Sequence, residues 1–257
     1  RAFPGKKIFF TDDNLFINSR RTTEICSAIV RNGVDIRWKG FLRADSVTRD
    51  NIELIAESGC DMAYLGIESG DDQILENMNK KERRCDAVRA VNLLNQHSIS
   101  TLLTLMIGFP GENTASVDNT ISLLNSFGAG HSFFNRYVPF EFIIAPLSPV
   151  ASPENRSRFG ISGSYNTWTH ATMDSEEAKK QYRRLFNSVT GCSLGYYEAD
   201  LLPPNLYHEL GCARDKLVRS GIGTLDNNTV AQVYETFRNT LGFGHEESIP
   251  IGQRCAA

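Results

Sequence analysis

Charged and glycine-rich groups recur in this sequence directly after short apolar runs. A carboxylate pair follows the first run, an arginine and an aspartate follow the second, a glutamate and a serine follow the third, and a glycine-rich turn follows the fourth. These groups are Asp12-Asp13, Arg43-Ala44-Asp45, Glu68-Ser69 and Gly108-Phe109-Pro110-Gly111-Glu112. Carboxylates accept hydrogen bonds from an ammonium, an arginine holds a carboxylate through two hydrogen bonds, and a Glu-Ser pair binds vicinal hydroxyls. Together the groups suit a small zwitterionic ligand that carries a sugar.

Each group alone also has a structural explanation. Asp12 and Asp13 are typical of a helix cap or of a Mg²⁺ site. Arg43 has the alternative of an ion pair with Asp45 or Glu68, and the glycine-rich turn is a type II turn whatever its function. Glu68 is the hardest to explain without a ligand, because a carboxylate at the end of an apolar strand loses water and needs a partner.

Strand-like and helix-like segments alternate over the first 140 or so residues. Strands that are apolar on both faces and alternate with helices favour parallel β/α units, in which the loops after the strands converge at one edge of the sheet. The four groups are therefore expected to lie together. The expected strands are 7–11, 35–42, 61–67, 100–107 and 137–144, and the expected helices are 19–32, 48–59, 71–78, 83–96 and 114–127.

A β/α barrel and a doubly wound sheet both satisfy this alternation. No Gly-x-Gly-x-x-Gly or Walker-type loop follows any of the strands, which disfavours a nucleotide-binding doubly wound sheet. After Pro146 the pattern changes to an irregular stretch rich in proline and glycine, followed by expected helices at 175–189, 206–220 and 228–241. We therefore expect a β/α part over residues 1–149 and a mainly helical extension on the substrate side over residues 150–257.

The composition is that of an ordinary globular chain. Of the 257 residues 41% are hydrophobic and the formal net charge is −3, so the sequence predicts neither disorder nor attraction to nucleic acid or an anionic membrane. The apolar runs are too short to cross a bilayer. The cysteines are scattered without a Cys-x-x-Cys pair, which predicts free thiols and a cytoplasmic location. They are Cys26, Cys60, Cys85, Cys192, Cys212 and Cys255.

The ordered set of motifs resembles the radical S-adenosylmethionine (SAM) enzymes over about residues 7–149. The branch it looks most like often carries an N-terminal cobalamin-binding domain. The resemblance implies a partial, TIM-like β/α barrel, present here from its second strand onward. The quoted motifs are Phe10-Thr11-Asp12-Asp13, Arg43-Ala44-Asp45, Gly66-Ile67-Glu68-Ser69-Gly70, Leu75-Glu76-Asn77-Met78-Asn79-Lys80 and Ile107-Gly108-Phe109-Pro110-Gly111-Glu112.

The resemblance also implies roles for individual residues. Asp12 and Asp13 correspond to a motif that meets the methionine amino group of SAM. Glu68 and Ser69 correspond to positions near the ribose and methionine moieties, and Arg43 to a position near the carboxylate or ribose. The remaining assigned contacts are Lys80 and, beside the adenine, Ile107, Gly108, Phe109, Pro110 and Gly111.

The implied activity is that of a methyltransferase or a related iron–sulfur oxidoreductase. Such an enzyme binds SAM at a [4Fe-4S] cluster and cleaves it reductively for radical chemistry, or supports cobalamin-dependent methyl transfer. The implied partners are a small-molecule or peptide substrate and an electron donor such as flavodoxin or ferredoxin.

One defining motif of the family is missing. The Cys-x-x-x-Cys-x-x-Cys loop, whose three thiolates hold the cluster, is absent, and family spacing would place it upstream of Arg1. We interpret this as truncation rather than degeneration, and expect the 257 residues alone to be inactive.

Other interpretations remain open at this point. Trp168 and His170 either face the substrate, with His170 as a proton shuttle near neutral pH, or form a packed aromatic and a hydrogen-bonded histidine before the helix at 175–189. A metal-dependent β/α-barrel hydrolase or lyase could use Asp12, Asp13 and Glu68 around a divalent ion. A non-catalytic scaffold derived from a radical SAM enzyme is the third class.

Overall fold

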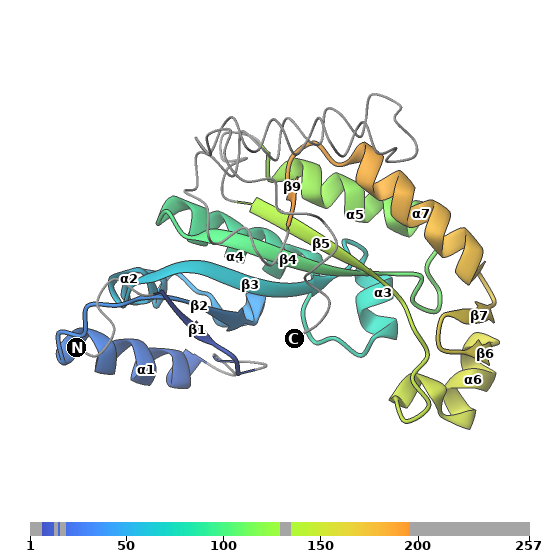
Figure 1. Cartoon of the computed structure of the whole chain (residues 1–257), viewed down its shortest axis with the longest axis horizontal. Coiled ribbons are helices and arrows are strands. Elements are labelled where there is room, and N and C mark those ends of the chain that lie inside the picture. Colours follow the sequence, from blue (N-terminus) through green and yellow to red (C-terminus); the bar gives the residue numbers. More distant parts are fainter. Residues whose placement is uncertain (1–6, 13–14, 16–18, 129–134, 196–257) are drawn as a thin grey trace, which may run out of the picture. The chain divides into compact units, whose positions relative to one another are not determined.

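The computed structural model describes residues 7–12, 15, 19–128 and 135–195. Its main element is a six-stranded sheet in the order β1-β2-β3-β4-β5-β9, with every neighbouring pair parallel (Figure 1). A doubly wound sheet would reverse its strand order at one point, whereas these strands follow one another in chain order, as in a β/α barrel. The strands are β1 (Lys7–Phe10), β2 (Arg37–Leu42), β3 (Cys60–Glu68), β4 (Ser100–Ile107), β5 (Asn135–Glu141) and β9 (Ser193–Leu194).

Helices connect the first five strands, so the predicted parallel β/α fold is confirmed. The predicted segments differ from the observed ones mainly at their ends, because a capping side chain determines where a helix begins. The side chain of Asp71 caps one helix and that of Asn113 another. The helices are α1 (Ser19–Arg31), α2 (Ile52–Glu57), α3 (Asp72–Asn77), α4 (Arg84–Gln96) and α5 (Thr114–Ser126), and a short 3₁₀ helix, η1 (Ala44–Ser46), follows β2.

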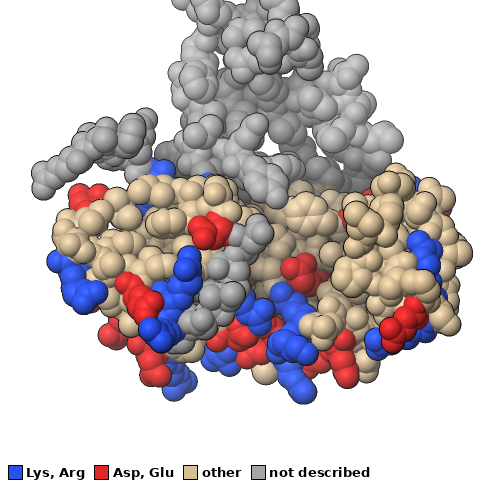
Figure 2. Space-filling model, turned by 90° about the horizontal axis from the view of Figure 1, so that it is seen from below, with Lys and Arg blue, Asp and Glu red and all other residues tan. Residues whose placement is uncertain are grey.

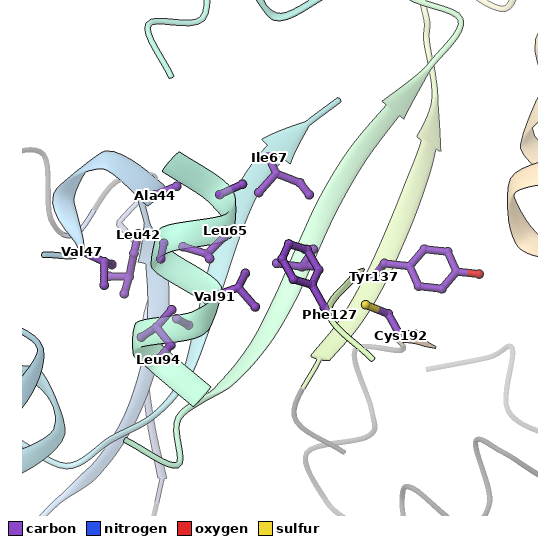
Figure 3. Packing of buried hydrophobic residues seen from close by; sticks show 14 of the residues in the cluster. Leu42, Ala44, Val47, Leu65, Ile67, Val91, Leu94, Phe127, Tyr137 and Cys192 are labelled. Carbon is purple, nitrogen blue, oxygen red and sulfur yellow. The ribbon is translucent and has the colours of Figure 1, made fainter. Parts of the chain in front are cut away.

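The main hydrophobic core lies between the sheet and its helices. Val91 and Leu94 of α4 pack with Leu42 of β2 and Leu65 of β3 (Figure 3). On the opposite face of the sheet a smaller cluster contains Met62, Tyr64 and Leu102. Both faces of the central strands are therefore apolar, which explains why their sequences lack a polar–apolar alternation.

The stretch after β5 is more regular than its sequence suggests. Helix α6 (Pro153–Phe159) has a proline at its first position, and Ser152 caps its N-terminus. Gly160 caps its C-terminus with a φ of +63°, in the left-handed region that glycine adopts easily. A three-stranded antiparallel sheet follows. Its short strands, with at most one apolar side chain each, carry little periodicity for sequence analysis to detect. They are β6 (Ser162–Ser164), β7 (Thr167–His170) and β8 (Met173–Asp174), and another 3₁₀ helix, η2 (Pro149–Ala151), precedes α6.

The described part of the expected helical extension also adds to the parallel sheet. After α7 (Ser175–Ser188), β9 pairs with β5 and becomes the sixth strand. Contacts therefore group residues Arg1–Glu198 in one compact unit and Ala199–Ala257 in another. The boundary at 149/150 remains a prediction, and the helices expected at 206–220 and 228–241 lie outside the described residues.

The surface carries charges of both signs. In Figure 2 basic and acidic side chains lie intermixed over the described part of the face shown, as the small formal net charge leads one to expect. Within the described ranges, none of the helices is both long and apolar enough to cross a membrane.

Candidate functional site at the carboxyl ends of the strands

Five charged side chains meet beyond the ends of β2 and β3, and we call them the charge cluster. Arg43 binds Asp45 through two hydrogen bonds, from Nη2 at 2.6 Å and from Nε at 2.9 Å. The same Nη2 lies 3.3 Å from Oε1 of Glu82. Lys80 Nζ lies 3.2 Å from Oε2 of Glu82 and 3.9 Å from Oε1 of Glu68. The structure thus brings together the predicted residues Arg43, Glu68 and Lys80.

Glu68 owes its position to a local irregularity of β3. The register with β4 shifts between Gly66 and Glu68, and Glu68 adopts a φ of 56°, a left-handed conformation that costs a non-glycine residue free energy. Its carboxylate lies over Gly66, where a Cβ atom would come within 2.5 Å of Oε1. Burial raises the pKa of Glu68, and the nearby Lys80 partly offsets that rise.

Glu82 belongs to the charge cluster although sequence analysis missed it. Its side chain is 3% exposed and lies between two cations, Arg43 and Lys80. Burial raises its pKa, and Lys80 and then Arg43 oppose that rise. The only sequence signal is a single acid within the basic run 80–84. An isolated charge of opposite sign in such a run is a candidate for a buried pair.

The carboxylates after β1 are placed differently. Asp12 is exposed, and its Oδ1 lies 3.5 Å from Arg21 of α1. Asp13 lies outside the described residues. Within the described part of the chain no three His, Cys, Asp or Glu side chains are arranged to hold a metal ion. The roles predicted for Asp12 and Asp13 toward SAM remain predictions.

The side chain of Ser69 forms a hydrogen bond at the start of α3. Its side chain is buried, with Oγ 3.4 Å from Thr120 Oγ1 and accepting a hydrogen bond from the Asp71 N–H at 3.2 Å. Thr120 also accepts from the N–H of Gly70, where a Cβ would collide with α5. Ser69 therefore joins β3 to α5, and its predicted contact with SAM remains a prediction.

The glycine-rich turn after β4 has two positions whose backbone conformation only glycine adopts easily. Gly108 and Gly111 both have φ values of +97°. Asn77 of α3 donates to the carbonyl of Pro110 at 3.2 Å and occupies the space where a Gly111 Cβ would project. Of the residues predicted beside the adenine, Ile107 points into the main core, whereas Phe109 is partly exposed. Of these two residues, Phe109 is thus the better candidate for ligand contact.

Three side chains hold Gly108, and we call them the Gly108 clamp. Glu112 accepts from the Gly108 N–H, and His170 Nε2 lies 3.2 Å from the Gly108 carbonyl. The Trp168 ring fills the space that a Cβ on Gly108 would need, with ring atoms 2.8 and 2.9 Å from it. Residues from β7 therefore fix the turn after β4, across a long separation in sequence.

The hydrogen bonds of His170 define its ring tautomer. The Thr172 N–H donates to Nδ1 at 3.3 Å, so Nδ1 is an acceptor and the proton on Nε2 is donated to Gly108. The ring stacks on Trp168 with centroids 5.2 Å apart, and burial lowers the pKa of His170. Both nitrogens contact protein groups, so His170 supports the turn here, and its proton-shuttle role remains a prediction.

Glu112 is the other buried titratable group beneath the turn. It is fully buried, and its Oε1 has no hydrogen-bond partner among the described residues. Burial raises its pKa to about 7, although the bond from Gly108 opposes the rise. A buried carboxyl group with one oxygen that accepts no hydrogen bond favours its neutral, protonated form more than an exposed carboxyl group does.

A hollow of about 940 Å³, which we call the apolar groove, lies between the glycine-rich turn and α6. Phe109 and Met106 form its β4 side, Phe140 and Phe142 its β5 side, and Phe159 the α6 side. On one side the end of α3 and residues 78, 79 and 81 complete it. Because these residues adjoin Lys80, the groove and the charge cluster are next to one another.

The described cysteines do not form an iron–sulfur site. Cys26, Cys60 and Cys192 are buried, Cys85 is exposed, and all four are free. Burial raises the pKa of Cys60 well above the ordinary range and that of Cys192 to about 12, which favours the thiol over the thiolate that iron requires. The residues described here therefore do not fit a [4Fe-4S] cluster.

Comparisons with known proteins match about half of this chain. Residues 1–124 match the family model described as Radical SAM superfamily. An uncharacterized methyltransferase of Pyrococcus horikoshii is 29% identical over 135 residues, which is 52% of this chain and 29% of that protein. The bacteriochlorophyllide d C-12(1)-methyltransferase of Chlorobaculum tepidum is 27% identical over 141 residues, 53% of this chain and 30% of that protein. The chain thus spans less than a third of these curated relatives.

One solved structure that part of this chain matches is the radical S-adenosylmethionine methyltransferase TsrM of Kitasatospora setae. It is described with cobalamin and a [4Fe-4S] cluster bound. Its sequence is 18% identical, the match covers 56% of this chain and 29% of that one, and the TM-score is 0.48.

Proposed function

We propose, since residues 1–124 belong to the radical SAM superfamily, that this chain supplies the SAM-binding face of a radical SAM methyltransferase. The observation that carries the proposal is the charge cluster at the carboxyl ends of β2 and β3, where both signs of charge lie within a few ångströms. This is the edge at which β/α barrels bind ligands.

The charge cluster has groups available for a zwitterion. Asp45 and Glu82 engage Nε and Nη2 of Arg43, which leaves the Nη1 donors without a partner among the described residues. Those donors suit the carboxylate of SAM. Lys80 Nζ lies 3.9 Å from Oε1 of Glu68. Oε2 of Glu68 can therefore accept a hydrogen bond from the ammonium or a ribose hydroxyl of SAM. The residues present therefore fit SAM.

The turn after β4 would complete the site. Asn77 and the Gly108 clamp keep the turn in place. Trp168 and Asn77 fill the space beside Gly108 and Gly111, so the adenine would lie along the outer side of the turn, where Phe109 is partly exposed. When bound beside a reduced [4Fe-4S] cluster, SAM supplies a radical or a methyl group. In this proposal the described residues bind and orient SAM, and the cluster ligands come from outside them.

The SAM-binding part of the proposal can be tested on this chain directly. Titration calorimetry with SAM, and with S-adenosylhomocysteine, should detect binding, and Arg43→Gln and Glu68→Gln should each weaken it about tenfold, the effect of losing one charge-assisted hydrogen bond. The matched controls are Arg49→Gln and Glu53→Gln, exposed residues in and near α2, which should bind as the parent does. No binding by the parent chain, or equal loss in the controls, would refute the proposed site.

The methyl-transfer part needs the whole protein. Purified anaerobically with iron and sulfide, and supplied with an electron donor of the flavodoxin or ferredoxin kind and with cobalamin, it should bind a [4Fe-4S] cluster and convert SAM. S-adenosylhomocysteine as a product indicates methyl transfer, whereas 5′-deoxyadenosine alone indicates hydrogen abstraction and would reject the methyltransferase proposal. The name of the Chlorobaculum relative supports methyl transfer as the first expectation.

A further inference from the structure

The walls of the apolar groove are preformed. Phe109 packs edge-on against Phe142 with ring centroids 5.2 Å apart, and more loosely against Phe159 at 6.5 Å. Phe142 in turn packs on the Trp168 ring at 5.3 Å, and the Trp168 N–H donates to the Phe142 carbonyl. Rings held by one another keep their positions without a ligand. The volume of about 940 Å³ is at the upper end of the range of small-molecule sites.

Apolar side chains along the groove remain exposed. Phe140 is 43% exposed and Ile143 is 55% exposed, and both line it. Apolar surface that stays in water is unfavourable compared with buried apolar surface. Contiguous apolar surface inside a hollow is typical of a ligand site rather than of ordinary surface. The groove therefore suits a ligand with a large apolar body.

Most polar groups that line the groove are already bonded within the protein. Asn77 donates to the Pro110 carbonyl, Asn155 to the Pro149 carbonyl, and Ser148 to the Ala145 carbonyl. These groups therefore contribute little to ligand recognition. Specificity must come from the charged residues at the margin.

Arg158 is the cation best placed to bind a ligand. It lies on α6, its guanidinium carbon is 4.6 Å from the centre of the Phe159 ring, and it has no carboxylate partner among the described residues. The ring restricts the guanidinium, so less conformational entropy is lost when it binds an acid. A planar guanidinium holds a carboxylate through two hydrogen bonds.

Two acids also line the groove, but both have other neighbours. Glu76 Oε2 accepts a hydrogen bond from Gln73 at 3.4 Å. Lys179 Nζ is paired with Glu176 Oε1 at 2.7 Å and acts on Glu141 only as a weaker, longer-range charge. Lys81 donates to Asn79 and adds a second positive charge to the margin. The lining thus holds two acids and two cations, and an acidic end group of a ligand is favoured at Arg158, which stacks on a ring of the groove and has no carboxylate partner among the described residues.

We infer that the apolar groove binds the substrate of the proposed SAM-dependent reaction, and that this substrate is an apolar, ring-containing carboxylic acid. The ring system would lie against Phe109, Phe142 and Phe159, and the carboxylate would pair with Arg158. This inference rests on the proposed function for its reaction, because the groove adjoins the residues proposed to bind SAM. The binding itself does not depend on catalysis.

Three pyrene probes with one apolar body and different end groups test this inference on the chain itself. We expect pyrenebutyric acid to bind about tenfold more tightly than pyrenebutanol, by pyrene fluorescence, with pyrenebutylamine weakest. Arg158→Gln should remove the advantage of the acid and leave the alcohol unchanged. Arg49→Gln, another exposed arginine without an ion pair in the described part of the chain, should bind like the parent.

A second variant checks the location. Ile143→Glu places a negative charge at an exposed position of the groove and should weaken all three probes, the acid most. Equal binding of acid and alcohol, preference for the amine, or an unchanged Arg158→Gln would overturn the inference, as would the absence of any probe binding. Calorimetry with S-adenosylhomocysteine on the same samples separates the two proposals, because retained SAM-site binding with failed probe binding rejects only the groove.

Discussion

The two sides of the strand-end site hold their residues by different forces. On the β2/β3 side, the charge cluster positions Arg43, Glu68 and Lys80 through ion pairs that are partly open to solvent. On the β4/β5 side, the Gly108 clamp positions a turn through close packing, with Trp168 filling the place of a missing side chain. The first side depends on charge, and the second on shape.

This difference predicts different responses to mutation. Replacing one partner of an ion pair near the surface lowers the free energy of unfolding only a little, because water and dissolved ions solvate the remaining charge. A packed turn has no such substitute, and an added methyl group must displace a ring. The charge cluster should therefore be adjustable, whereas the packed position at Gly108 should not tolerate an added side chain.

The largest expected effect is that of Gly108→Ala. The new Cβ would meet Trp168 and Ala178 within 3 Å, in a backbone conformation that also disfavours alanine, so we expect a loss of roughly 3 kcal/mol or more in unfolding free energy. Gly33→Ala is the matched control, because Gly33 also has a positive φ but no atom within 4 Å of a Cβ. It should lose about 1 kcal/mol in urea denaturation. Equal losses would show that backbone conformation, not packing, sets the cost.

Glu112→Gln should change how stability depends on pH. The folded-state pKa of about 7 lies above the ordinary value of 4.5, so the folded chain binds a proton that the unfolded chain releases. The stability that this provides is complete below pH 4.5 and is lost as the pH rises through about 7. The variant lacks this loss, so its stability relative to the parent should rise by about 3 kcal/mol between pH 4.5 and pH 8.5. Parallel pH profiles of the two proteins would contradict the assignment.

Within the charge cluster, Glu82→Gln should cost more than Asp45→Asn. Glu82 is buried between two cations, so we expect a loss of about 1–2 kcal/mol in unfolding free energy. Asp45 is exposed, and its loss should cost less than about 1 kcal/mol and shrink further in high salt. Guanidinium would mask the salt effect, so urea is the suitable denaturant. A larger loss for Asp45 would show that burial does not determine the strength of these pairs.

The meeting of Arg43 and Glu68 followed from sequence because it depends on topology, whereas the barrel-like strand order and the place of Lys80 were expected only from the resemblance to radical SAM enzymes. Helices between apolar strands impose parallel pairing, and parallel pairing brings the strand ends together. The membership of Glu82 did not follow, because it depends on the path of the loop after α3, which no local pattern specifies. Asp12 was expected at the same edge, yet its ion pair is with Arg21 on α1.

The Gly108 clamp was still less predictable. Sequence patterns report local periodicity, whereas Gly108 and His170 are 62 residues apart in the chain. Trp168 and His170 drew attention through their residue types, and the packed alternative was weighed, but nothing in the sequence identified Gly108 as their partner. Contacts between segments that are far apart in the sequence produce no periodic pattern of apolar residues, particularly where the strands are short.

The smallest expected effect distinguishes the two roles of His170. His170→Gln keeps a donor for the Gly108 carbonyl and should cost about 1 kcal/mol or less, whereas His170→Ala leaves that carbonyl unpaired and should cost about 2 kcal/mol. Because burial lowers the pKa of His170, the parent should lose stability as the pH falls below the ordinary histidine range, and both variants should lack that loss. If His170 only holds the turn, His170→Gln in the whole protein should keep most of the SAM turnover with an unchanged pH profile. A proton shuttle at this position would instead lose turnover in both variants alike.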